Sequence, residues 1–238
     1  MSEERKSASL SGAGKLSGGD YARVSISGAG KVSGNLKAEE LHISGAGKVE
    51  GNVEAREVAV SGGASFAGSV TAEEMSVSGA ARIGGEVKVK ELKCSGTFRV
   101  AGSVVSEYVK VSGHIHVAKN LEAEIFKASG GFTVDGLLSA DKIEVRLGGK
   151  CYAGEIGGEK IEIVRGGFRE RGILFDGLVR MFSGSGLVEL KAKLVEGDEV
   201  ELEDATVGVV RGKKVKIGSG CHIEAVEYSE SLDVHSSA

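Results

Sequence analysis

The chain has 238 residues, a formal net charge of −4, 41% hydrophobic residues and 38 glycines, with no proline and no tryptophan. This length allows one or two domains, and the charge argues against a strongly basic nucleic-acid binder and against an acidic tail protein. Glycine is about twice as frequent as in average proteins, but without proline or a Gly-x-y period the sequence is not collagen. Since the apolar content is enough for a packed core, we expect the glycines to belong to a regular backbone.

The amino-terminal stretch MSEERKSASLSGAG has no apolar run typical of a signal peptide. No stretch approaches the ~18 apolar residues that span a bilayer. The three cysteines, Cys94, Cys151 and Cys221, are odd in number and lack C-x-x-C spacing. We therefore expect a cytoplasmic chain with free thiols. Residues 1–10 and 229–238 are predicted to be disordered.

Residues 11–163 are built from a unit of about 17 residues. Eight units begin at Ser11, Ser27, Ser44, Ser61, Ser78, Ser95, Ser112 and Ser129, and a degenerate one begins at Arg146. They follow the pattern S-G-x-x-x-φ-x-G-x-φ-x-A-E-x-φ-x-φ, where φ is apolar. Apolar and polar positions alternate over short runs, which is typical of strands, and glycines are expected at the corners between runs. Coils of this kind bury a core only when they stack, at ~4.8 Å, so the predicted fold is all-β, a single-stranded parallel β-helix (solenoid).

Equivalent positions of the units predict the core. The sixth position is expected to point inward and holds Leu16, Val32, Val49, Phe66, Ile83, Val100, Val117, Val134 and Cys151. The fourth position changes along the chain from Gly14, Gly30 and Gly47 through Ala64 and Ala81 to Phe98, Ile115 and Phe132. The interior is therefore expected to widen, or to be filled differently, toward the middle. Cys94 and Cys151 fall in core columns, whereas Cys221 is a candidate for exposure.

After Ile163 the register is lost, and residues 164–186 form an apolar excursion, predicted to be a loop or short helix. It contains Ile173, Leu174, Phe175, Leu178, Val179, Met181 and Phe182, together with Arg169, Arg171 and Arg180. Such a segment either folds back to plug or flank the β-helix, or lies on a membrane surface or a partner. Coil-length segments with period-2 apolar sites then return, which predicts terminal β-helix coils over residues 187–228.

Two charged rows are expected on the surface. The fifth position is mainly basic, with Lys15, Lys31, Lys48, Arg82, Arg99 and Lys150. The thirteenth and fourteenth positions are mostly acidic, with Glu39, Glu40, Glu57, Glu73, Glu74, Glu91, Glu107, Glu124 and Asp141. These rows are either a solvated surface that keeps rods apart or surfaces for lateral docking or anionic lipid head groups. Direct DNA binding is disfavoured by the negative net charge and the few aromatic residues.

No catalytic, cofactor or metal site is predicted. Ile217–Ile223 looks like one hexapeptide of the left-handed β-helical acyltransferases, but it stands alone and a period of 17 cannot be cut into sixes. His114 and His116 are expected to point outward from one strand, with Ile115 inward, and the neighbouring coils offer no third metal ligand. The histidines form no triad with Ser and Asp. We therefore expect a non-enzymatic protein.

The coils between Ser27 and Val145 and the closing segment VVRGKKVKIGSGCHIEAVEY resemble the bactofilins, polymer-forming cytoskeletal proteins of bacteria, in their longer Gram-positive-type branch. This resemblance implies a right-handed β-helix that forms filaments without nucleotide and acts as a cytoplasmic scaffold, often at the inner face of the membrane. The implied partners are other copies of the chain, the anionic membrane surface, and cell-morphology or envelope proteins. The chain departs from typical members because it has no proline-rich flanks, more coils, and the excursion.

The ends of the rod are the predicted polymer interface, because a β-helix leaves unpaired backbone groups and an exposed core section there. Leu16, Val24 and Ile26 are expected at the first coil, and Val215, Ile217, Ile223 and Val226 at the last. The alternative is a soluble adaptor that recruits partner proteins through its charged rows, with its ends blocked by the terminal segments.

Overall fold

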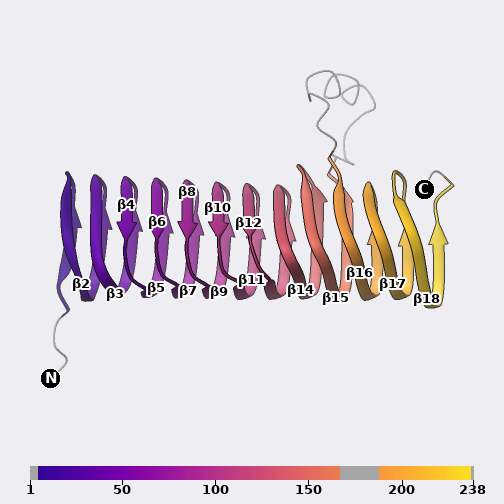
Figure 1. Cartoon of the computed structure of the whole chain (residues 1–238), viewed down its shortest axis with the longest axis horizontal. Helices are drawn as coiled ribbons and strands as arrows, with labels where there is room; N and C mark the ends of the chain where they lie inside the picture. Colours follow the sequence, from indigo (N-terminus) through magenta and orange to yellow (C-terminus); the bar gives the residue numbers. More distant parts are fainter. Residues whose placement is uncertain (1–4, 167–187, 237–238) are drawn as a thin grey trace, which may run out of the picture.

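The computed structural model describes residues 5–166 and 188–236, and within these ranges the chain forms strands and no helix. The strands are β1 (Ser7–Leu10), β2 (Gly14–Ile26), β3 (Ala29–Ile43), β4 (Ala46–Val49), β5 (Val53–Val60), β6 (Gly63–Phe66), β7 (Val70–Val77), β8 (Ala80–Ile83), β9 (Val87–Cys94), β10 (Thr97–Val100), β11 (Val104–Val111), β12 (His114–Val117), β13 (Leu121–Ala128), β14 (Gly131–Leu147), β15 (Cys151–Arg165), β16 (Leu190–Leu202), β17 (Ala205–Ile217) and β18 (His222–Val234). Figure 1 shows them stacked as coils along one long axis, with β2 near one end and β18 at the other.

Each strand pairs in parallel with the equivalent strand of the next coil. The short strands β4, β6, β8, β10 and β12 form one wall of the stack, and the longer strands β5, β7, β9, β11 and β13 form the rest. The parallel β-solenoid predicted from the sequence is confirmed. Its right hand, implied by the resemblance, stays a prediction.

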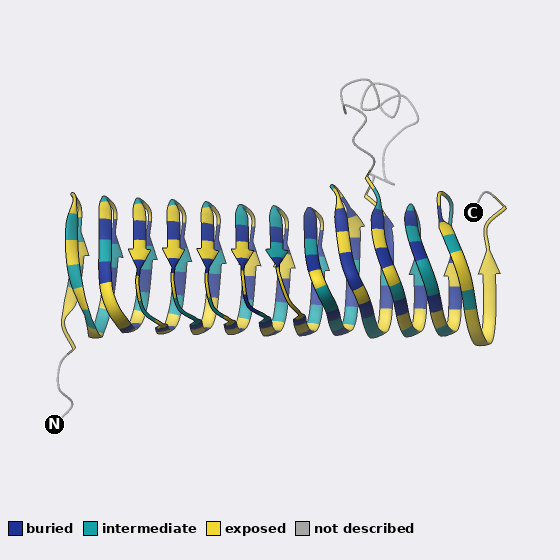
Figure 2. Ribbon diagram, in the orientation of Figure 1, coloured by how far each residue is buried: buried dark blue, intermediate teal, exposed yellow. Residues whose placement is uncertain are grey.

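The core is a bundle of apolar columns that run along the stack, visible as dark blue bands in the coils of Figure 2 before β18, which has no buried residue. The fourth position packs against the last residue of the preceding coil, and the two vary together. A Cβ built on Gly47 would lie 2.8 Å from Cγ2 of Ile43, whereas Phe132, which is fully buried, follows a coil that ends in Ala128. A small residue in one column is therefore matched by a large residue in the other, and this keeps the interior filled.

The glycine of the Ser-Gly pair that opens each coil, from Gly28 to Gly130, provides room for stacking and not an unusual backbone conformation. A Cβ on Gly96 would lie 1.9 Å from the carbonyl oxygen of Gly79, and one on Gly113 would lie 2.1 Å from that of Gly96. The described glycines with left-handed φ are Gly19, Gly34 and Gly220. The expectation that every such glycine turns a corner through its conformational freedom is therefore wrong for most coils. The close approach of consecutive backbones requires glycine there.

Side chains at the ninth position tie coils together at a turn that lacks strand pairing. The Oδ1 atom of Asn35 accepts a hydrogen bond from the backbone N–H of Asn52 at 2.9 Å, and Oδ1 of Asn52 accepts one from Ser69 N–H at 2.9 Å. Ser69 Oγ then accepts from Glu86 N–H at 3.1 Å. This hydrogen-bonded column was not predicted from the sequence, where the asparagines resemble ordinary turn residues.

One column can be followed through the strand pairing along the whole rod and has twelve members. We call it the fifth-position column, and it consists of Lys15, Lys31, Lys48, Ser65, Arg82, Arg99, His116, Thr133, Tyr152, Lys191, Thr206 and His222. Most steps are 17 residues long, but Thr133 to Tyr152 is 19 and Lys191 to Thr206 is 15.

The 19-residue step corrects two predictions. Cys151 pairs with Phe132, so it occupies the fourth position and not the sixth, which is held by Ala153. Lys150 precedes the fifth-position column by two residues and does not belong to the basic row. The reason is that the turn around Gly148 and Gly149 has two more residues than the turns of the regular coils. The first residues of β15 therefore lie two positions later than the repeat predicts.

Both predicted disordered ends contain ordered strands. Residues Ser7–Leu10 pair with Arg23–Ile26, and β18 continues to Val234 beside β17. These segments were too polar to be recognised as strands, yet their backbone groups pair with the exposed edge of the adjacent coil. The excursion differs in this respect, because residues 167–187 lie outside the described residues. On either side of it, β15 and β16 pair directly from Cys151↔Leu190 onward, so the stack is continuous there.

Candidate assembly surfaces

The carboxy-terminal end of the rod exposes the cross-section of the core. Val207, Val210, Val215 and Ile217 on β17 are buried, and they pair with Ile223, Val226, Leu232 and Val234 on β18. On β18 the side chains of Leu232 and Val234 are 36% and 53% exposed, and that of Tyr228 is 54% exposed. The apolar columns thus end in exposed residues on β18, and no described strand pairs with its outer edge (Figure 1).

The amino-terminal end is smaller and less apolar. There, β1 covers the second half of β2, and Leu10, Leu16 and Tyr21 are partly buried against the core. The first half of β2 pairs with β3 on one side, from Gly14↔Gly30 to Ser17↔Ser33. This end therefore also leaves a strand edge that can accept a partner.

Four of the predicted interface residues lie inside the rod. Val24 and Ile26 are 0% exposed beneath β1, and Val215 and Ile217 are buried beneath β18. Their placement at an end surface is therefore wrong, because a further strand, β1 or β18, covers each of them. Leu16, Ile223 and Val226 are partly buried and border the two ends.

Most charged side chains on the walls form ion pairs with the next coil. Stacked partners such as Lys127 and Glu144 are joined at 2.6 Å, and Lys216 and Glu201 at 2.7 Å. The hydrogen bond that Lys127 donates holds the pKa of the Glu144 carboxyl below its ordinary value. Such pairs neutralise charge between coils, although like charges also stack, as in Glu40, Glu57, Glu74 and Glu91.

Two rows behave differently. In the fifth-position column, Lys15, Arg82 and Arg99 form no ion pair within residues 5–166 and 188–236, while Lys31 and Lys48 share Glu50 at 2.7 and 3.9 Å. A second row, at the thirteenth position, holds Glu107, Glu124, Asp141 and Glu159, and these carboxylates also have no ion pair with a described residue. The other predicted acidic residues lie in the first coils, where several meet cations, as in Glu40 with Arg23 at 2.6 Å.

His114, His116 and Cys94 lie where the coil pattern placed them, whereas Cys151 and Cys221 do not. Ile115 is buried, His114 and His116 are half-buried on the outside, and His116 Nε2 lies 3.1 Å from Asp135 Oδ2. Burial, with a smaller contribution from Arg99, lowers the pKa of His114. Cys221, a candidate for exposure, is instead 3% exposed. Burial raises the pKa of the Cys94 and Cys151 thiols to about 11, so neither is a thiolate at neutral pH.

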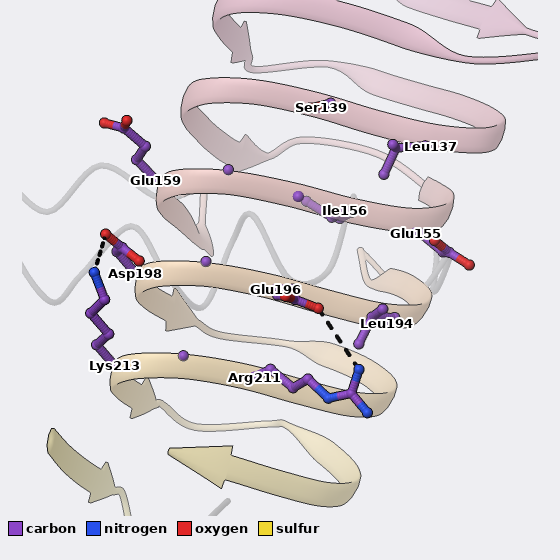
Figure 3. Close-up of a pocket in the computed structure, with 14 residues that line it drawn as sticks. Leu137, Ser139, Glu155, Ile156, Glu159, Leu194, Glu196, Asp198, Arg211 and Lys213 are labelled. Carbon is purple, nitrogen blue, oxygen red and sulfur yellow. Dashed lines mark hydrogen bonds and ion pairs between the residues drawn. The ribbon is translucent and has the colours of Figure 1, made fainter. Parts of the chain in front are cut away.

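A shallow groove of about 720 Å³ crosses β14 to β17 (Figure 3). Its floor contains Gly158, Gly197 and Gly212, which stack in register. A Cβ on Gly158 would lie 2.2 Å from the Ala140 carbonyl oxygen, so glycine at this point again allows coils to approach. At the rim, Lys213 pairs with Asp198 at 2.8 Å and Arg211 with Glu196 at 3.8 Å, whereas Glu155 and Glu159 form no ion pair with a described residue. The groove thus follows from the stacking of the coils.

Among the described residues, no three His, Cys, Asp or Glu side chains are grouped to hold a metal ion. In the same part of the chain, no helix is long and apolar enough to cross a membrane.

A stack of parallel coils whose apolar columns end in exposed residues defines a β-solenoid with an open end. A model of the bactofilin family, described as polymer-forming cytoskeletal, matches residues 7–105, so the predicted resemblance is confirmed over that part of the chain.

Two relatives come from Bacillus subtilis (strain 168). The chain is 39% identical over 97 residues to the uncharacterized protein YhbE, and this matched stretch covers 40% of this chain and 37% of YhbE. It is 52% identical over 40 residues to the uncharacterized protein YhbF, or 17% of each chain. The chain thus matches well under half the length of either relative. No solved structure matches.

Proposed function

We propose that the protein is a non-enzymatic cytoskeletal scaffold whose rods join end to end into filaments without nucleotide. The observation that carries this proposal is the carboxy-terminal end, where four core columns finish on β18 and Leu232 and Val234 remain open to solvent. The bactofilin segment supports the same class of function, because that family is described as polymer-forming.

The physical reason is that an end of a β-solenoid is both a sheet edge and a core section. An unpaired edge strand is a template for pairing with another chain, and here the same surface offers apolar side chains. A second rod that stacks on β18 would continue the backbone pairing and bury these side chains together. Since the walls of the rod contain few large exposed apolar residues, the ends are the favoured contact.

Electron microscopy and sedimentation of the purified chain test the proposal. Wild type is expected to form filaments without added nucleotide. The double variant Leu232→Lys/Val234→Lys is expected to remain monomeric, because two cations would be buried unpaired at the contact. Val105 is the matched control, since it is 40% exposed on the wall in β11, and Val105→Lys should leave filaments intact.

Three results would contradict filament formation through this end. They are a wild type that sediments as a monomer across salt and concentration, a double variant that still polymerises, and an equal loss of filaments in the wall control. The first result would favour the soluble adaptor. Thermal unfolding of each variant separates a lost contact from a lost fold.

We also propose that the filaments lie in the cytoplasm at the membrane surface. The support is the bactofilin segment and the sequence of the excursion, whose apolar residues Ile173 to Phe182 lie outside the described residues. Co-sedimentation with anionic vesicles is expected for wild type and reduced for Phe175→Glu/Phe182→Glu. Equal binding by the double variant would exclude docking through this segment, and a much lower unfolding temperature would indicate that it packs on the rod.

A further inference from the structure

The acidic row at the thirteenth position is regular along the second half of the rod. Glu107, Glu124, Asp141 and Glu159 each precede by one residue a member of a register-paired column, Tyr108, Ile125, Lys142 and Lys160. All four carboxylates are exposed. The row ends where Asp198, one coil further, is neutralised by Lys213 at 2.8 Å.

The basic row lies in the first half of the rod. It comprises Lys15, Lys31, Lys48, Arg82 and Arg99, which share one column of the stack with Ser65. Within residues 5–166 and 188–236, Glu50 is the single carboxylate that pairs with the row, and two of its lysines share it. Stacked like charges destabilise a sheet modestly, so both rows carry a cost that ion-paired neighbours such as Lys127 and Glu144 avoid.

The two rows lie on opposite sides of the rod. Glu107 is eight residues after Arg99 and nine residues before His116, and Arg99 and His116 are stacked partners in the fifth-position column. The thirteenth position is therefore half a coil away from the fifth. It also lies on the long strands, whereas the basic residues Arg82 and Arg99 lie on the short strands β8 and β10.

We propose that rods pack side by side, with the basic row of one copy against the acidic row of a neighbour. The two rows have the same axial spacing, one charge per coil in most coils, so several ion pairs can form at once. Because one row occupies the first half and the other the second half, neighbouring rods that run in the same direction are staggered along their axes. Because the rows lie on opposite sides, the contact is heterologous and does not close, and it extends into a flat sheet of rods.

Charge complementarity within one chain favours a second copy as the occupant of each row. A single surface ion pair contributes little, but a row of pairs in register acts together, and its strength should fall as salt screens it. The bundling of filaments rests on the proposed function, because it requires filaments to form. The lateral contact itself does not, because a single rod already has both rows.

Charge reversal tests the proposal in three variants. The first reverses the basic row with Lys15→Glu/Arg82→Glu/Arg99→Glu, and the second reverses the acidic row with Glu107→Lys/Glu124→Lys/Asp141→Lys. The control, Lys88→Glu/Lys110→Glu/Lys119→Glu, has the same change in net charge as the first, and its three exposed lysines lie outside both rows. Electron microscopy measures bundling, and small-angle scattering measures the cross-section of the particles.

Wild type and control are expected to bundle at about 0.05 M salt and to separate into single filaments near about 1 M, where the screening length is shorter than a coil. Each row variant should give single filaments at both salt concentrations. Filaments of the two row variants, assembled separately and then mixed, should bundle again, because one has two acidic rows and the other two basic rows.

Bundling of either row variant alone, loss of bundling in the control, or no bundling in the mixture would overturn the lateral contact. Wild-type filaments that stay single at low salt, yet bind anionic vesicles through the basic row, would assign that row to a lipid surface instead. If no filaments form, the proposed function fails by itself. Scattering then decides the lateral contact, since side-by-side rods increase the cross-section and end-to-end rods increase the length.

Discussion

Gly96 has no space for a side chain, and its neighbours show how single residues determine stacking. A Cβ there would overlap the Gly79 carbonyl oxygen at 1.9 Å. We expect Gly96→Ala to lower the free energy of unfolding by about 1–3 kcal/mol, the usual cost of overpacking. Urea unfolding in the Leu232→Lys/Val234→Lys background measures this without polymerisation.

Gly63 is the control for this substitution, because no atom lies within 4 Å of a Cβ built on it and its stacked neighbours are Ala46 and Ala80. Gly63→Ala is expected to be neutral or to stabilise by up to about 1 kcal/mol, since alanine restricts the unfolded chain. Equal effects at the two glycines would contradict the role of close backbone approach.

The buried thiols provide a prediction for pH. Burial raises the pKa of Cys94 and Cys151 from 9.0 to about 11, so the folded state holds these protons while the unfolded state loses them above pH 9. The thiol contribution to stability is therefore present below pH 9 and is lost as the pH rises toward 11. Iodoacetamide at pH 8 should modify both cysteines far more slowly in the native protein than in urea. Similar rates in the two states would show that the core columns open readily.

At the scale of the element, the asparagine column supports the turn between the short and the long strand. Asn52→Ala removes the acceptor for the Ser69 N–H, which lies 2.9 Å away. We expect a loss of about 0.5–1.5 kcal/mol, the net value of one hydrogen bond. Asn52→Asp keeps an acceptor at the same place and should cost less. Urea unfolding compares the two variants, and a larger loss for Asp than for Ala would contradict this role.

The strands of the regular coils could be predicted because each apolar position recurs in nearly every repeat of the sequence. Val58, Met75 and Leu92 occupy one such column and are fully buried. The step before Cys151 could not be placed, because its two extra residues fit the pattern on either side of the turn. Strand β1 was missed because SASL has one large apolar residue and pairs mainly through its backbone.

At the scale of the molecule, the charged rows were predictable as columns but not as sites. The sequence places Lys37 and Lys15 alike on the outside, yet Lys37 meets Glu54 at 2.5 Å and Lys15 forms no ion pair with a described residue. Such a difference depends on side-chain geometry between coils. The ends of the rod were misplaced for a related reason, since the last strands carry too little apolar pattern to be recognised.

The unequal steps of the fifth-position column mean that the number of coils, and not the number of residues, determines the length of the rod. A step of 15, 17 or 19 residues, or the 39 residues from Tyr152 to Lys191, each advances the stack by one strand spacing. Twelve such positions correspond to a rod of roughly 58 Å at ~4.8 Å per coil. Loss or duplication of a whole coil during evolution would therefore shorten or lengthen the rod by one strand spacing, while both end surfaces stayed unchanged. Residues inserted between two coils, in contrast, would leave the length of the rod unchanged.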